Sequence, residues 1–139
     1  MHVTDNRIAE IYRELRTLKL EDASNAIAVL LRVFLELSVD HFLTKNGGAL
    51  QSTDSKSGKK FYKSLDRKVH ECVEMLVSMG VPKENFDSVK RALTVKTSPL
   101  YVDLLHSYIH DRFETPTPSQ NKAAWNSAQP LFEKMWPAP

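Results

Sequence analysis

The sequence is poor in the residues that cross-link a chain or turn it sharply. Its 139 residues include four glycines and a single cysteine, Cys72. One cysteine excludes a disulfide within the chain and is typical of a reducing compartment such as the cytoplasm. No turn signal joins two segments of alternating polar and apolar residues, so the sequence predicts no β-hairpin. It also has no glycine-rich phosphate-binding loop and no Ser-His-Asp signature.

The composition lacks a strong excess of charge of either sign. Hydrophobic residues make up 42% of the chain and charged residues 26%, with a formal net charge of +2 at pH 7. That balance is ordinary for a globular protein, and it neither requires nor excludes a nucleic-acid partner. The length suits one domain with a sizeable core, so we expect residues 1–139 to form a single domain. The first residues, MHVTDNRIAEIYRELR, are charged and lack the apolar stretch of a secretory signal.

Long uninterrupted apolar runs are missing as well. The most apolar segment, AIAVLLRVFLELSVDHFL at residues 26–43, contains Arg32, Glu36 and Asp40. Each charge would cost about 2.5–3.5 kcal/mol at the centre of a bilayer, so no membrane span is expected. A helix that is apolar nearly all round is usually enclosed by other helices. This segment is therefore predicted to be the central helix of a bundle.

Helical periodicity fills most of the remaining chain. Apolar residues recur at helical spacing over residues 4–18, with Thr4 or Asp5 as the N-cap, and Gly47 suits the end of the central helix. Further helices are predicted over residues 61–79, 82–95, 98–113 and 120–136.

Two features interrupt this helical pattern. Residues 46–60 are polar and rich in Gly and Ser, and they are expected to form a mobile loop. Pro130 is expected to kink or divide the last helix because it lacks a backbone N–H. The fold prediction is all-α, an antiparallel helical bundle of about six helices.

Two histidines and the cysteine are the candidates for metal binding and for nucleophilic chemistry. His106 and His110 are four residues apart and share a helix face, which suits zinc if a third ligand is present. The metalloprotease pattern requires a glutamate at the position of Ser107, so we expect neither a metal site nor another cofactor. Cys72 lies on the apolar face of its predicted helix, where a buried and inert thiol is expected.

A basic run, KSGKKFYKSLDRK, has aromatic residues within it. Lys59, Lys60, Lys63 and Arg67 are the candidate nucleic-acid-binding residues, because cations bind phosphates and the interleaved Phe61 and Tyr62 can stack on bases. Its remaining cations are Lys56 and Lys68. A solvated loop and helix start explains the same pattern, and the sequence favours that interpretation.

The stripe formed by Arg32, Glu36 and Asp40 is a stronger indication of a specific site than the basic run is. These residues are four apart, so they lie along one side of the central helix. A buried arginine needs a partner, which Glu36, Asp40 or another helix has to supply. On another helix the candidates are His106, His110 and Asp103. We hypothesise that the stripe is buried, that Arg32 pairs with Glu36, and that both face the segment bearing His106 and His110.

Three segments together resemble a known family. LLRVFLELSVDHFL, LDRKVHECVEMLVSMG and LLHSYIHD resemble the HEPN-like all-helical domains of prokaryotic defence proteins of the abortive-infection type. The first matches at Arg32, Leu35 and Glu36, the second at Leu65, Lys68 and Val69, and the third at Leu105, Tyr108, Ile109 and His110. The closing segment, AWNSAQPLFEKMW, is similar to the aromatic last helix of that group, so the resemblance spans residues 23–136.

The resemblance implies two alternative functions, and the basic run adds a third. Catalytic HEPN-like domains are metal-independent ribonucleases with an Arg-x(4–6)-His motif at a dimer interface, and this chain lacks that spacing. The first expectation is therefore a non-catalytic dimerising or interaction domain of a phage-defence or toxin-type protein. This expectation allows the chain to be a fragment of a longer protein that has an effector domain. The second is a ribonuclease acting on RNA, with Arg32, Glu36, His106 and His110 converging in space. The third is a nucleic-acid-binding module that uses the basic run.

A homodimer is expected for two reasons. HEPN-like domains commonly pair. We also expect one small bundle to leave the apolar residues near the end of the sequence uncovered. These residues are Leu131, Phe132, Met135 and Trp136.

Overall fold

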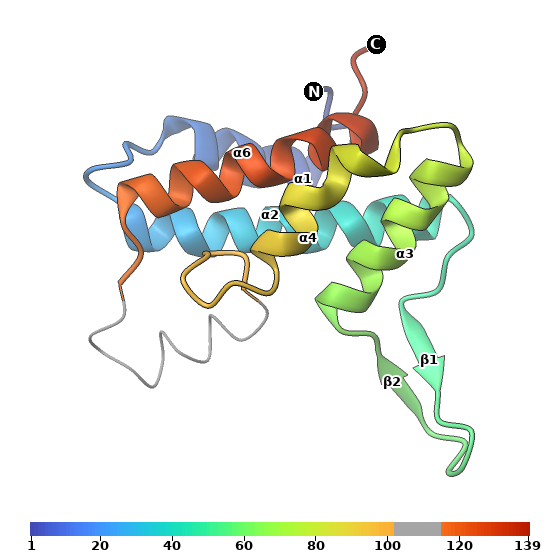
Figure 1. Ribbon diagram of the computed structural model, residues 1–139. Helices are drawn as coiled ribbons and strands as arrows, with labels where there is room; N and C mark the ends of the chain where they lie inside the picture. Colours follow the sequence, from blue (N-terminus) through green and yellow to red (C-terminus); the bar gives the residue numbers. More distant parts are fainter. Residues whose placement is uncertain (102–114) are drawn as a thin grey trace.

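The computed structural model describes residues 1–101 and 115–139. Within them lie five α-helices, one 3-10 helix and a two-stranded antiparallel sheet, which makes the described fold almost entirely helical (Figure 1). The elements are α1 (Asn6–Thr17), α2 (Ser24–Lys45), β1 (Gln51–Thr53), β2 (Lys60–Tyr62), α3 (Leu65–Ser78), η1 (Lys83–Phe86), α4 (Asp87–Ala92) and α6 (Pro118–Met135). The helix predicted over residues 98–113 falls largely outside the described residues.

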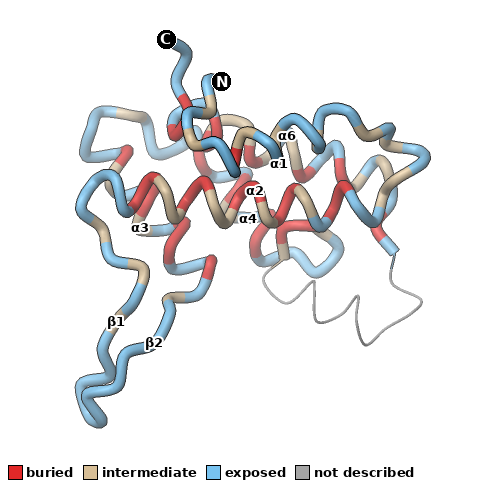
Figure 2. The backbone as a smooth tube through the Cα atoms, turned by 180° about the vertical axis from the view of Figure 1, so that it is seen from behind, coloured by how far each residue is buried: buried red, intermediate tan, exposed pale blue. Residues whose placement is uncertain are grey.

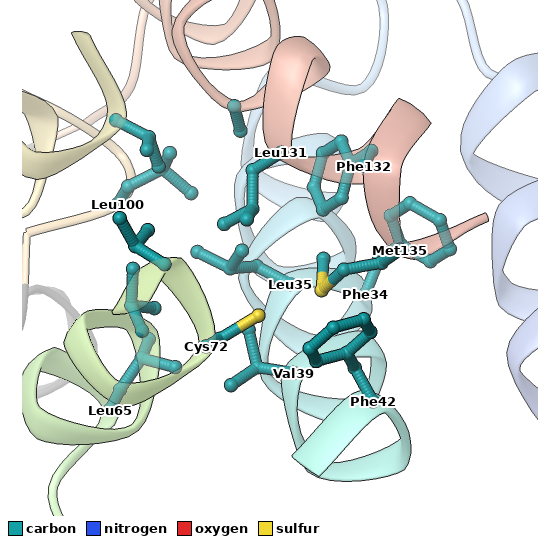
Figure 3. Close-up of a cluster of buried hydrophobic side chains, with 14 of the residues drawn as sticks. Phe34, Leu35, Val39, Phe42, Leu65, Cys72, Leu100, Leu131, Phe132 and Met135 are labelled. Carbon is teal, nitrogen blue, oxygen red and sulfur yellow. The ribbon is translucent and has the colours of Figure 1, made fainter. Parts of the chain in front are cut away.

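Helix α2 is the centre of the bundle, as its sequence predicts. It contacts α1, α3 and α6, and most of its length is buried (Figures 1 and 2). Phe34, Leu35 and Val39 are fully buried, and Figure 3 shows them packed among side chains from α3 and α6. A helix covered on most sides by other helices needs apolar residues over most of its surface, which explains its nearly continuous apolar sequence.

The helices are not uniformly antiparallel, which corrects part of the fold prediction. Near the start of both helices, Asn121 of α6 donates to the Ser24 carbonyl of α2 at 2.9 Å. Further along both helices, the indole N–H of Trp136, which follows α6, donates to the Ser38 hydroxyl of α2 at 2.9 Å. Helices α2 and α6 therefore run parallel. They are remote in sequence, so no short turn imposes opposite directions on them.

Local capping signals account for several helix ends, and α6 differs from its prediction in two ways. Asp5 caps α1 by accepting from the Ile8 N–H at 3.0 Å, as the sequence allows, and Gly47 takes a φ of +80° just beyond α2. Helix α6 begins earlier than predicted, because Thr117 and Gln120 form a reciprocal capping box. It then continues as one helix through Pro130, so the expected division is wrong, while the alternative expectation of a kink stays a prediction.

The apolar residues at the end of the chain are covered. Leu131 and Phe132 are fully buried, and Met135 and Trp136 are 7% and 3% exposed. They pack onto α2, with the Trp136 ring also stacked on His41 at a centroid distance of 4.8 Å. The structure therefore removes this reason for expecting a homodimer, since a single chain already buries the surface in question.

Candidate nucleic-acid interface

A β-hairpin projects from the helical body where a mobile loop was expected. Strands β1 and β2 pair with Gln51 opposite Tyr62, Ser52 opposite Phe61 and Thr53 opposite Lys60. The Lys63 N–H donates to the Leu50 carbonyl at 3.0 Å and extends the ladder toward the bundle. Figure 1 shows this hairpin, which we call the β1–β2 arm (residues 50–63), standing away from the helices.

The tip of the β1–β2 arm is an ordered turn built around Asp54. The Asp54 carboxylate accepts from the Lys56 N–H at 2.8 Å, and the Asp54 carbonyl accepts from the Gly58 N–H at 2.9 Å. The Lys56 N–H lowers the pKa of the Asp54 carboxyl, because it stabilises the charged form. Gly58 has a φ of +68°, which an L side chain rarely adopts. These contacts hold the two strands in one register.

Two aromatic side chains of the arm lie in solvent. Tyr62 is 76% exposed and Phe61 is 45% exposed. Neighbouring strand residues point to opposite faces, so Tyr62 shares one face with Lys60 while Phe61 lies on the other. On the Tyr62 face, Lys60 and Tyr62 line a shallow open groove with Gln51 and Thr53. Both rings are therefore accessible from solvent, one on each face of the arm.

The cations of the basic run lie in three different environments. Lys56, Lys59 and Lys60 are exposed on the arm, and none of them forms an ion pair with another described residue. Lys63 and Arg67 instead approach Glu71, at 2.8 and 3.4 Å. Of the four predicted nucleic-acid-binding residues, Lys59 and Lys60 are therefore available to a phosphate, whereas the other two are partly neutralised by a carboxylate.

Lys68, the last cation of the run, is buried. Its ammonium group lies 2.7 Å from Asp40 and 3.2 Å from Glu36, both on α2. The Lys68 side chain is 6% exposed, whereas those of Asp40 and Glu36 are 26% and 43% exposed. This three-residue cluster joins α3 to α2, so Lys68 serves the fold and is not a surface cation.

The polar stripe is only partly as hypothesised. Arg32 is buried at 7% exposure, as expected, but Glu36 pairs with Lys68 and not with Arg32. The Arg32 guanidinium donates to the backbone carbonyls of Tyr101 at 2.7 Å and Leu100 at 3.5 Å. A lysine from another helix reaches Glu36 first, so the Arg32–Glu36 pairing is wrong. His106, His110 and Asp103 lie outside the described residues.

Cys72 is fully buried on α3, as its sequence position predicts. Burial raises the pKa of its thiol to about 12, so the reactive thiolate is scarce at neutral pH. Across residues 1–101 and 115–139, no three His, Cys, Asp or Glu side chains converge in a way that would hold a metal ion. In the same residues, no helix combines the length and apolarity needed to cross a bilayer.

Comparisons with known proteins gave no match: none among family models, none among curated proteins and none among solved structures. The HEPN-like resemblance therefore stays a prediction. The β1–β2 arm itself was missed by sequence reasoning. Its signal is the segment Thr53-Asp54-Ser55-Lys56-Ser57-Gly58, whose Asp, Ser and Gly residues favour a turn between two short strands.

Proposed function

We propose that this chain is a non-catalytic interaction module that binds single-stranded RNA through the β1–β2 arm. The observation that supports this function best is the exposure of Phe61 and Tyr62 beside Lys59 and Lys60 on one projecting hairpin. Unpaired bases stack on aromatic rings, and lysines contact the phosphates between them.

Single-stranded RNA fits the arm better than a duplex does. A base can reach an aromatic ring only if it is already unstacked, and stacking on one ring contributes about 1–3 kcal/mol per base. Tyr62 and Phe61 lie on opposite faces of the hairpin, so two bases would flank the arm and not share one platform. Lys59 and Lys60 add attraction for phosphate without base preference.

The setting we propose is a cytoplasmic HEPN-like protein of prokaryotic antiviral defence, acting as a homodimer. Its support is the resemblance of residues 23–136, since the covered apolar end no longer argues for pairing. The ribonuclease alternative depends on Arg32, Glu36, His106 and His110 together. RNA cleavage in EDTA that is abolished by His110→Ala would establish that alternative in place of a non-catalytic module.

Binding of a fluorescein-labelled 20-nucleotide oligouridine, followed by fluorescence anisotropy, tests the proposal. Phe61→Ala/Tyr62→Ala is expected to weaken binding at least about tenfold, because two stacking contacts are lost. Val77→Ala/Met79→Ala is the matched control, since both residues are exposed apolar side chains on the helical body. The proposal fails if wild type does not bind, or if both double variants bind equally well. Binding of a protein partner and not RNA through the arm would also overturn it.

A further inference from the structure

The two ends of the chain lie side by side (Figures 1 and 2). The His2 N–H donates to the Trp136 carbonyl at 3.3 Å, which holds the N-terminal segment against the segment that follows α6. A cavity of about 110 Å³ lies where these two segments meet the last turns of α2. Phe42, Met135 and Trp136 line it and are only 8%, 7% and 3% exposed. Packed side chains of the core therefore back the cavity.

Three basic side chains from two different segments line the same cavity. His2 comes from the N-terminal segment, and His41 and Lys45 are one turn apart on α2. Thr4 adds a hydroxyl group. None of the three basic residues forms an ion pair with another described residue. Like charges that share a small space repel one another, so this arrangement favours an anion between them.

The carboxylates nearest to the cavity along these segments are engaged elsewhere. The Asp5 carboxylate caps α1, and that of Asp40 lies 2.7 Å from the Lys68 ammonium group. On α6, Glu133 accepts from the Gln129 side chain at 2.8 Å. Among the described residues that line the cavity, none is acidic. The protein therefore supplies no negative charge of its own to this space.

The imidazole of His41 has a defined orientation. Its ring stacks on that of Trp136 at a centroid distance of 4.8 Å and an interplanar angle of 27°. The Trp136 ring is itself fixed, because its indole N–H donates to the Ser38 hydroxyl at 2.9 Å. A stacked imidazole keeps both nitrogens in the plane of the ring, so they can donate from its edge when protonated. The indole face also favours the protonated form through its negative quadrupole.

We propose that this cavity binds a compact oxyanion, either a phosphate ion or the phosphate group of a small molecule. The Lys45 ammonium group and the protonated imidazoles of His2 and His41 donate charge-assisted hydrogen bonds to its oxygens. An uncharged molecule of the same size would leave the basic groups without a counter-charge. The site shares no residue with the β1–β2 arm, so it does not depend on RNA binding.

Sulfate is the first probe, because it keeps two negative charges between pH 6 and pH 8. In ¹⁵N-labelled protein at constant ionic strength, sulfate at pH 6 is expected to shift the indole N–H signal of Trp136. The signal of Trp125 is the internal control, since that residue does not line the cavity, and Trp125→Phe assigns the two signals. At pH 8 the affinity is expected to fall at least about fivefold, because the imidazoles lose their protons. The proposal is overturned if millimolar sulfate moves neither signal or both alike, or if the affinity is the same at both pH values.

Two variants test the basic groups separately. His41→Phe keeps a ring against Trp136 but removes both nitrogens, and Lys45→Gln removes the ammonium group. Each is expected to weaken sulfate binding at pH 6 at least about fivefold. Lys122→Gln is the control of equal charge, because Lys122 is exposed near the start of α6, and it should keep the wild-type affinity. Equal affinities of Lys45→Gln and Lys122→Gln would indicate only general attraction to a cationic surface and would overturn the proposal. Lys45 is exposed, so this comparison still decides if His41→Phe does not fold.

Inorganic phosphate and uridine 5′-monophosphate distinguish the two sources of the anion, with uridine as the control that has no phosphate. Tighter binding of the nucleotide than of phosphate indicates the phosphate group of a small molecule, and equal binding indicates the free ion. Uridine is expected not to bind at the cavity. A shift of the Trp136 signal by uridine as large as that by the nucleotide would contradict anion recognition.

Discussion

The ammonium group of Lys68 lies 2.7 Å from a carboxylate oxygen of Asp40, which joins α3 to the central helix. The cation is the buried partner, because its side chain is 6% exposed and that of Asp40 is 26% exposed. Glu36, 3.2 Å from the same ammonium group, is 43% exposed. Water can therefore hydrate the carboxylates if the lysine is removed, but it reaches the lysine poorly if the carboxylates are removed.

This asymmetry predicts unequal costs of mutation. Asp40→Asn/Glu36→Gln leaves a buried cation without a counter-charge and is expected to destabilise the fold by about 3–5 kcal/mol. Lys68→Met keeps the apolar stem and leaves two partly hydrated carboxylates, so it is expected to cost only about 1–2 kcal/mol. Urea unfolding of the three proteins measures both values. The interpretation is wrong if Lys68→Met is the more damaging change.

Arg32 and Glu36 should contribute independently to the free energy of unfolding, although they are four residues apart on α2. Arg32→Met removes a charged donor from the carbonyls of Leu100 and Tyr101, which we expect to cost about 1.5–3 kcal/mol. In a double-mutant cycle with Glu36→Gln, the expected coupling energy is below about 0.5 kcal/mol. A coupling above about 1 kcal/mol would show that the two side chains pair after all.

Cys72 is expected to resist thiol reagents until the protein unfolds. At pH 8 a disulfide reagent such as DTNB should react with the thiol only as fast as the fold opens, and at once in guanidinium chloride. The thiol pKa is about 12 in the fold against an ordinary value of 9.0, so the unfolded chain ionises first. The thiol's contribution to stability is complete below pH 9 and is lost as pH rises toward 12. Rapid labelling of native protein would contradict this burial.

The homodimer remains a prediction that solution mass measures directly. Light scattering at micromolar concentration is expected to give about twice the chain mass of 15.8 kDa. A monomer alone would remove the pairing that the HEPN-like resemblance implies. RNA binding by the β1–β2 arm would be unaffected, because the arm belongs to one chain.

Local patterns in the sequence were enough to predict most of the helices. Asp5 caps α1 and Gly47 follows the end of α2 through contacts with residues a few positions away. Such signals can be recognised in the sequence before the fold is known. The apolar face of α3, with Cys72 on it, was likewise visible in the helical spacing. These features depend only on residues that are close together in the sequence, so a single sequence is enough to predict them.

Contacts between remote residues could not be predicted in this way. Lys68 belongs to a basic run and was therefore read as a surface cation. Its burial results from contact with Asp40 and Glu36 of α2, which lie 28 and 32 residues earlier in the sequence. Phe61 lies four residues before Leu65, and this helical spacing led to the prediction of a helix that begins at residue 61. The strand pairing with Ser52 outweighs that spacing, and Ser64 caps α3 after the hairpin has ended.

The salt dependence of RNA binding tests the central claim most directly. For a single strand, each phosphate contact contributes about −0.7 to the slope of log K against log salt concentration. Lys59→Ala/Lys60→Ala is therefore expected to make the slope shallower by about 1.4. Lys83→Ala/Lys96→Ala is the control of equal charge, with both lysines exposed on the helical body, and it should keep the wild-type slope. Equal slopes for both variants, or binding that salt does not weaken, would contradict the assignment of the β1–β2 arm as an RNA-binding element.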